Sequence, residues 1–185
     1  MQIRPAHPDD AHTIAEVHVQ TWKETYTGIF PSSVLDRLDV AERAAAWQAR
    51  IPDLTQNRQA LSVAVVDGAM VGFAGCGPAR KAELGADGEI YMINIVNRGK
   101  RRHLGTRLML EMANALTTNG FCSAGLWVLE KNNPARAFYA RLGGSQSIAV
   151  EDDHDGVKLN DLAILWPQVE ILRERAAAVI SAKPA

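Results

Sequence analysis

The spacing of apolar residues changes several times along this chain, and each change predicts a new element. Residues 89–96 alternate between apolar and polar and are rich in Ile, Val and Tyr, which is typical of a half-buried strand. From Leu104 onward the apolar residues fall at positions 104, 108, 112, 115 and 116, which is helical spacing. A short basic turn ending in Gly105 separates the two segments. The centre of the chain therefore predicts a strand, a turn and an amphipathic helix.

The first half of the chain shows helical and strand patterns in alternation. Asp67-Gly68 supplies the positive φ angles that a tight hairpin turn requires. Ser32 or Ser33 can cap a helix that follows Pro31. The predicted elements are a strand at 2–4, a helix at 8–25, a short helix at 32–38, a helix at 41–51 and a hairpin with strands at 61–66 and 69–75.

The second half predicts a strand at 121–129, a helix at 132–142, a hairpin with strands at 145–150 and 157–165, and a last helix at 167–181. Asn119-Gly120 and Gly143-Gly144 stop the helices that precede them. The order predicts a mixed α/β sheet flanked by helices, in which only the two central strand–helix units offer parallel crossovers. We expect one domain over residues 1–185, with its core at about 2–166.

Composition excludes several classes of protein. The net charge of −1 gives no global affinity for nucleic acid or for anionic membranes. Cys76 and Cys122 lie far apart without metal-ligand spacing, so we expect no metal, a reducing cytoplasm and two cysteines that serve as small strand hydrophobes. The chain has no apolar signal core and no segment long enough to span a bilayer, so we expect no membrane association.

The basic turn predicts a site for a phosphorylated ligand. Lys100, Arg101 and Arg102 precede a helix N terminus, where free N–H groups and the positive end of the helix dipole favour an anion. The alternative is a solvated basic patch or a weak nucleic-acid footprint. No aromatic residues alternate with the basic ones, which argues against nucleic acid.

Two motifs together resemble the GNAT superfamily of acyl-CoA-dependent N-acetyltransferases. Residues 100–105 align with its phosphate turn, Gln/Arg-x-x-Gly-x-Gly/Ala, and residues 126–139 match a strand followed by Asn-x-x-Ala-x-x-Phe-Tyr, with Gly143 closing the helix. Residues 17–31 resemble a small bacterial-type branch of this family, whose amine substrates are undefined. His103 stands where the family usually has Gly; we expect a helical first-turn conformation to tolerate it, with altered rather than lost phosphate contact.

The resemblance implies a GNAT fold, in which a mostly antiparallel sheet contains one splayed parallel strand pair, here 89–96 and 121–129. Acetyl-CoA would be the cosubstrate and would lie between these strands. Main-chain groups near Ile93 and Ile95 would pair with its acetyl and pantetheine parts. Asn132 would hydrogen-bond the pantetheine arm or, alternatively, cap a helix. The full set of residues implied to bind the cosubstrate is Ile93, Ile95, Lys100, Arg101, Arg102, His103, Leu104, Gly105, Thr106, Asn132 and Arg136.

The family also implies two catalytic residues. Glu89 would be the general base or a water relay, although an exposed edge carboxylate explains the same position. Tyr91, expected on the same face, is a second candidate for the base or a wall of the substrate site. Tyr139 would donate a proton to the leaving thiolate, because a phenol is protonated at neutral pH. Phe138 is expected in the core.

The acceptor would lie against Trp22, Tyr26 and Phe30, but core packing explains their spacing equally well. His18, on the same predicted stripe, is expected to be a partly buried polar residue rather than a base.

The expected activity is transfer of acetyl from acetyl-CoA to a primary amine of a small molecule or peptide, by direct attack in a ternary complex. A second possibility is a GNAT-fold sensor that binds CoA or acyl-CoA without turnover. A nucleotide-binding α/β protein is a weaker one, since the chain has no Walker lysine loop or dinucleotide glycine pattern. Homodimerisation through the last helix is left open.

Overall fold

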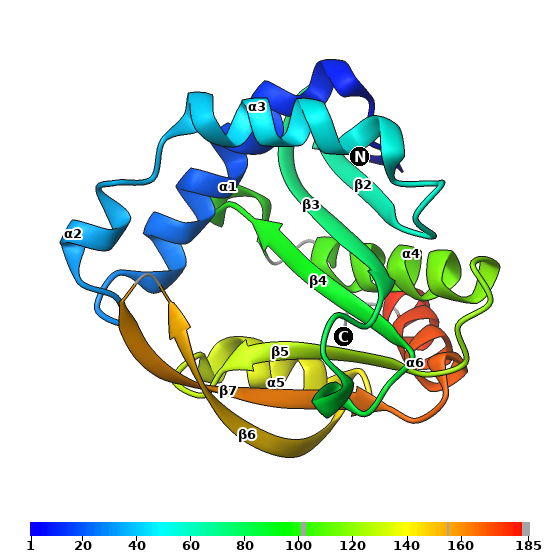
Figure 1. The fold of residues 1–185 in the computed structure, drawn as a ribbon. Coiled ribbons are helices and arrows are strands. Elements are labelled where there is room, and N and C mark those ends of the chain that lie inside the picture. The colour runs from blue at the N-terminus through cyan, green and yellow to red at the C-terminus, as the bar shows by residue number, and fades with distance from the viewer. Residues whose placement is uncertain (101–102, 155, 183–185) are drawn as a thin grey trace.

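The computed structural model describes residues 1–100, 103–154 and 156–182, and its strands form one sheet of order β1-β2-β3-β4-β5-β7-β6 (Figure 1). The strands are β1 Gln2–Pro5, β2 Ala60–Val66, β3 Ala69–Pro78, β4 Gly88–Ile95, β5 Ala124–Leu129, β6 Ser145–His154 and β7 Val157–Trp166. The helices are α1 Ala11–Tyr26, α2 Ser32–Leu35, α3 Val40–Arg50, α4 Leu104–Thr118, α5 Asn133–Arg141 and α6 Val169–Ser181. The sequence predicted each of these elements, with boundaries that differ by a few residues.

Strands β4 and β5 form the parallel pair, and they stay paired over two positions. Gly88 lies opposite Ala124 and Glu89 opposite Gly125. Beyond these positions β4 continues to Ile95 and β5 to Leu129 without pairing to each other, and their ribbons diverge in Figure 1. The remaining neighbouring strands pair antiparallel. The predicted mostly antiparallel sheet with a splayed parallel pair is therefore confirmed.

A β-bulge at Tyr91 interrupts the alternation that the sequence suggested for β4. Gly75 of β3 pairs with Met92, whereas the next residue, Cys76, pairs with Ile90, so Tyr91 has no partner of its own. Such an extra residue shifts the side chains that follow it to the opposite face. Ile90 therefore shares a face with Cys76, whose Sγ lies 3.8 Å from the Met112 carbonyl of α4.

The two faces of the sheet are covered by different helices. Helix α4 packs on β2, β3 and β4 on one face and also contacts α6. On the other face Phe73 of β3 packs edge-on against His18 of α1 and Trp47 of α3, at centroid distances of 5.7 and 5.8 Å. Asn94, opposite Phe73 in the ladder, shares that second face. Residues four apart on β4, Ile90 and Asn94, thus face opposite sides because of the bulge.

Several local expectations were wrong. Ser32 and Ser33 do not cap α2: its N-cap is Pro31, and no side chain bonds the helix end. Cys122 is exposed and lies before β5, whereas Cys76 is buried in a strand as expected. The second predicted strand–helix unit, β5 and α5, does not place β6 beside β5 as a parallel neighbour, because β7 lies between these two strands.

In the part of the chain that the structure describes, no helix is long and apolar enough to cross a bilayer. Within the same residues, His, Cys, Asp and Glu side chains form no group of three or more able to hold a metal ion.

Candidate active site

The candidate site is the wedge between β4 and β5, which opens from Glu89 and Gly125. The outer edges of both strands remain fully paired, since β4 pairs with β3 as far as Ile95 and β5 pairs with β7 as far as Leu129. On the inner edges, residues 90–95 of β4 and 126–129 of β5 have no strand partner in the described chain. Unpaired strand edges offer main-chain donors and acceptors to an extended ligand. Ile93 and Ile95, predicted to bind the cosubstrate, both lie on this edge of β4.

Helix α4 begins near the open end of the wedge. Its first N–H groups have no intrahelical partner, and no side chain caps them among the described residues. Thr106 and Leu104 are buried in its first turn. A Cβ on Gly105 would lie 3.2 Å from Cζ of Phe138 and 3.5 Å from Cδ1 of Ile95. Gly105 therefore allows α4 to pack closely on α5 and β4.

The turn before α4 differs from the expectation at His103. This residue is the helix N-cap, with φ 55° and ψ 13°, which is the left-handed region and not the predicted helical first-turn conformation. A side chain there is strained, and the glycine usual in the family would not be. Lys100 is exposed at the end of the 3-10 turn η4, Asn97–Gly99. The predicted contacts of Arg101 and Arg102 lie outside the described residues.

Glu89 is buried at the closed end of the wedge, with 1% of its surface exposed. The exposed-carboxylate alternative is therefore wrong. Arg80, which follows β3, donates from its backbone N–H to Oε2 of Glu89 at 2.9 Å and from Nε to Oε1 at 3.1 Å, and its Nη2 also bonds Oε1. Hydrogen bonding to Glu89 raises the pKa of Arg80. Arg80 thus compensates the buried carboxylate, and sequence reasoning missed it because the pairing depends on the β3–β4 loop.

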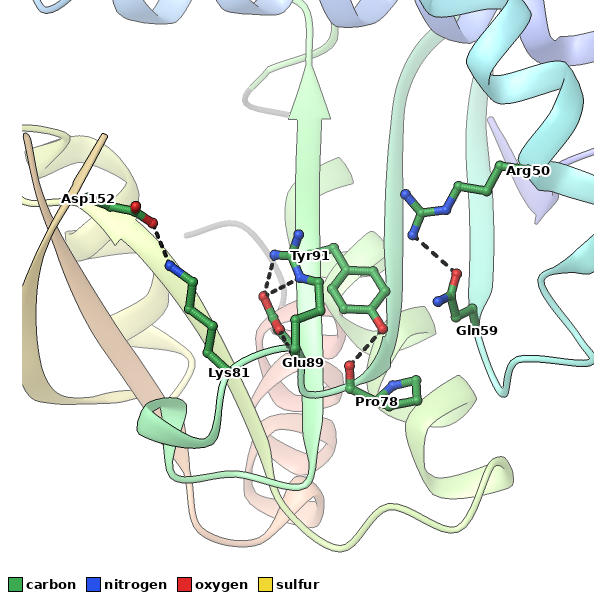
Figure 2. Close-up of polar contacts among 8 residues, drawn as sticks. Arg50, Gln59, Pro78, Lys81, Glu89, Tyr91 and Asp152 are labelled. Carbon is green, nitrogen blue, oxygen red and sulfur yellow. Dashed lines mark hydrogen bonds and ion pairs between the residues drawn. The ribbon is translucent and has the colours of Figure 1, made fainter. Parts of the chain in front are cut away.

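Tyr91 lies beside Glu89, and its hydroxyl donates to the Pro78 carbonyl at 2.7 Å (Figure 2). Its ring is flanked by two guanidinium groups, with Cζ of Arg80 at 4.7 Å and Cζ of Arg50 at 5.7 Å from the centroid. Burial, together with the charge of Glu89, raises the pKa of Tyr91 to about 12. The phenol therefore stays protonated at neutral pH.

Tyr139 reaches the core from α5. It is 7% exposed, and its ring packs edge-on against Trp166 at 6.3 Å and beside Phe138 at 5.3 Å. Burial raises the pKa of its phenol, which therefore holds its proton. No hydrogen bond engages its hydroxyl among the described residues. Phe138, expected in the core, is only partly buried and packs against the core near Gly105.

Asn132 and Arg136, two further residues predicted to bind the cosubstrate, make intramolecular contacts. Oδ1 of Asn132 accepts from the Ala135 N–H at 3.3 Å and caps α5, which is the alternative that the sequence left open. Arg136 donates to the Glu130 carbonyl at 3.0 Å and to Oε1 of Gln146 at 3.0 Å. Roles in cosubstrate binding stay predictions for both.

Trp22, Tyr26 and Phe30 form one aromatic cluster, with centroids 5.1 to 5.8 Å apart. The cluster is separate from the main core and packs on Leu129 at the end of β5 and on the start of β7. Figure 1 shows the end of α1 meeting the β6–β7 hairpin there. Phe30 is 5% exposed and packs as the core alternative expects, whereas Trp22 and Tyr26 are partly exposed. Contact of these residues with an acceptor stays a prediction.

An aspartate–histidine pair that the sequence did not suggest lies beside this cluster. Nε2 of His154 is 3.0 Å from Oδ2 of Asp161, and the His154 ring packs edge-on against Phe30 at 5.9 Å. Burial raises the pKa of Asp161, although His154 opposes the shift. The pair joins β6 to β7 across a mostly buried carboxylate, and only the hairpin register brings the two residues together.

A second ion pair links the two sides of the site. Nζ of Lys81, next to Arg80, lies 2.6 Å from Oδ2 of Asp152 on β6 (Figure 2). Both side chains are about half exposed, so solvent weakens the pair and it adds little stability. Its location is more informative: it connects the β3–β4 loop to the β6–β7 hairpin, on either side of the wedge.

His18 is partly buried, as expected. Its ring lies among Trp22, Trp47 and Phe73, at centroid distances of 5.7 to 6.4 Å. Burial, helped by the charge of Arg43, lowers its pKa to about 4, so the imidazole is neutral at pH 7. Its buried Nδ1 has no hydrogen-bond partner in the described chain.

The structure combines a sheet that splays at one parallel pair with a helix N terminus that no side chain of the described residues caps. Comparison with known proteins identifies the family to which this arrangement belongs. The model of the acetyltransferase (GNAT) family matches residues 19–144. The chain is 33% identical over 174 residues to an uncharacterized N-acetyltransferase, YuaI, of Bacillus subtilis, covering 92% of this chain and 95% of the relative. It is 25% identical over 143 residues to a probable N-acetyltransferase of Mycobacterium tuberculosis, Rv2775, covering 76% and 78%.

Solved structures share the fold. The PaiA N-acetyltransferase from Thermoplasma acidophilum, in complex with coenzyme A, aligns with a TM-score of 0.67 at 22% identity, covering 87% of this chain and 96% of the other. A putative acetyltransferase from Salmonella typhimurium, yncA, with acetyl-CoA, aligns with a TM-score of 0.68 at 18% identity, covering 91% and 94%. The chain therefore belongs to the GNAT acetyltransferase family. The predicted resemblance, fold class and assignment as an acyltransferase are confirmed.

Proposed function

We propose that this chain transfers an acetyl group from acetyl-CoA to a primary amine of a small molecule or peptide, by direct attack in a ternary complex. The observation that carries the proposal is the divergence of β4 and β5 after Glu89 and Gly125. Main-chain groups of an unpaired strand edge suit the amide-containing pantetheine arm. Two structures of the same fold bear coenzyme A or acetyl-CoA.

The cosubstrate would be held by main-chain groups more than by side chains. The backbone of residues 93–95 would pair with the acetyl and pantetheine parts. The first N–H groups of α4, at Leu104, Gly105 and Thr106, would bind the diphosphate, where the helix dipole adds to the attraction. Lys100, with the neighbouring arginines in the sequence, would neutralise its charge.

The chemistry requires a neutral amine and a proton for the departing thiolate. Bound acetyl-CoA supplies an activated thioester. Glu89 would take the proton from the amine, directly or through water, and Arg80 would hold its carboxylate in place. The phenol of Tyr139, kept protonated by burial, would donate to the leaving sulfur. An N–H of the unpaired β4 edge would stabilise the developing charge on the carbonyl oxygen.

The acceptor would approach on the face that carries Glu89 and Tyr91, between the α1–α2 region and the β6–β7 hairpin. Tyr26 and Trp22 would line it on one side. Their partial exposure supports a wall that a substrate can touch.

Calorimetric titration with acetyl-CoA is the first test, and absence of binding at high micromolar ligand would overturn the proposal. A panel of amines and peptides, followed by release of free thiol, is the second. Binding without thiol release across the panel would favour the sensor alternative. Thiol release with a matching acetylated product, found by mass spectrometry, is the expected result.

A further inference from the structure

Trp127 lies on the wedge and has no part in the proposed chemistry so far. It pairs with Ala163 of β7, and its neighbours on the same face of β5 are Gly125 and Leu129. Gly125 lies beside Glu89. A Cβ atom added to Gly125 would lie 2.8 Å from Cγ of Leu84. Leu129, one pleat further on, packs on Phe30. Trp127 therefore stands on the face that carries Glu89, across the opening wedge from Tyr91.

The indole of Trp127 has an unsatisfied hydrogen-bond donor. Its Nε1 is buried, although the side chain as a whole is partly exposed, and it has no partner in the described residues. A buried donor without a partner costs free energy, and such groups in native proteins call for an explanation. The other such atom among the described residues, Nδ1 of His18, belongs to a ring enclosed by three aromatic rings.

Several acceptors on this face already have other partners. Both oxygens of Glu89 bond Arg80, and Oδ2 of Asp161 bonds His154. The Tyr91 hydroxyl is held by the Pro78 carbonyl. An indole N–H can only donate, so its missing partner must supply an acceptor atom.

We infer that the indole N–H of Trp127 donates to a carbonyl oxygen of the acceptor, so that the preferred amines carry a carbonyl a few bonds from the nitrogen, as amino-acid amides and peptide N termini do. The inference rests on the proposed function. Trp127 lies two residues beyond Gly125, or roughly 6–7 Å along the strand. A ligand whose amine bonds Glu89 and whose carbonyl, two or three bonds away, bonds the Trp127 N–H would span this distance along the strand.

The test compares phenylalaninamide with 2-phenylethylamine, two amines that differ by the carboxamide. The wild-type chain should acetylate phenylalaninamide with the higher kcat/KM. Trp127→Phe keeps an aromatic ring but removes the N–H, so kcat/KM for phenylalaninamide should fall roughly 10- to 100-fold while that for 2-phenylethylamine changes little. The KM for acetyl-CoA should not change. Trp47→Phe removes an indole from α3 that is buried against Phe73 and His18, and it should preserve the ratio between the two amines.

A second measurement does not depend on the variant. In the ¹⁵N spectrum of the wild-type chain with CoA, the Trp127 indole N–H resonance should move downfield on addition of phenylalaninamide and stay in place with 2-phenylethylamine. Equal losses for both amines in Trp127→Phe, or a resonance that neither amine moves, would overturn the inference and leave acetyl transfer standing. Acetyl-CoA binding without turnover of any amine would instead overturn the proposed function, and the inference with it.

Discussion

Glu89 of β4 lies directly beside Gly125 of β5, at the last position where these two parallel strands pair. The side chain of Glu89 therefore stands where the wedge begins, and the glycine beside it leaves space that Leu84 partly fills. Arg80 holds the carboxylate through its backbone and its guanidinium. One partly exposed arginine thus compensates a buried carboxylate at the apex of the wedge, and the proposed role of Glu89 as a base can be tested directly.

Glu89→Gln should lower kcat by about 10²- to 10³-fold, because the amide keeps the shape of the side chain but cannot accept a proton. Steady-state rates of the wild type and the variant, at saturating acetyl-CoA and amine, check the loss of kcat. A variant that turns over as fast as the wild type would remove Glu89 as the base.

Arg80→Gln is the companion variant. It leaves the Glu89 carboxylate buried without its cation, so the free energy of unfolding should fall by roughly 2–3 kcal/mol. The double variant Glu89→Gln/Arg80→Gln should recover part of this loss, since no buried charge remains. Urea unfolding of all four proteins gives the coupling energy, and simple additivity would contradict a direct ion pair.

Tyr139→Phe should reduce kcat by about 10²-fold or more and leave the dissociation constant of acetyl-CoA within about twofold, since donation to the thiolate matters only in the transition state. The ring contacts with Trp166 and Phe138 remain in the variant, so thermal stability should hardly change. Titration calorimetry and steady-state kinetics separate the two quantities. Equal losses of binding and turnover would indicate a packing role instead.

His103→Gly should stabilise the chain by about 1 kcal/mol, because glycine occupies the left-handed region at φ 55° without the steric cost that histidine bears. The affinity for acetyl-CoA should stay equal or rise, since the backbone of the turn gains room beside the diphosphate. His103→Ala, which keeps the Cβ, is the matched control and should show neither gain. A lower melting temperature for the glycine variant would mean that the histidine side chain supports the turn.

His18 gives the chain a specific dependence of stability on pH. Its pKa is lowered to about 4 in the folded state by burial, so the unfolded chain takes up a proton below the ordinary histidine value of 6.5 while the folded chain does not. This contribution to stability is therefore present above pH 6.5 and is lost as the pH falls toward 4. The full shift corresponds to about 3 kcal/mol, of which some 2–3 kcal/mol is lost between pH 7 and pH 4.5.

His18→Leu should flatten this dependence. Nδ1 of His18 has no partner in the described part of the chain, so an apolar side chain among Trp22, Trp47 and Phe73 costs little at neutral pH. Urea unfolding at pH 7 and at pH 4.5 should show a smaller difference in the variant than in the wild type. His12→Gln, at an exposed position of the same helix, should leave the wild-type difference as it is. Equal slopes for His18→Leu and wild type would contradict the prediction.

Sequence patterns located the strands and helices because they are local signals. The hairpin turn at Asp67-Gly68 has φ values of 52° and 80°, as the dipeptide predicted. The bulge at Tyr91 could not be read in this way, since it exists only as a mismatch between β3 and β4. The left-handed His103 was missed for a related reason: only a small share of residues other than glycine adopt positive φ, and no local pattern marks the position.

The sequence by itself determined the order of elements and, through its two motifs, the family, because strand alternation, helical spacing and turn residues are set by neighbours along the chain. The region where the cosubstrate would bind stays a prediction. Only the tertiary structure decided that Glu89 is buried against Arg80, that the buried N–H of Trp127 has no partner among the described residues, and that Asp161 contacts His154. These contacts join residues from separate elements, and their partners are chosen by strand register and by the divergence of β4 from β5.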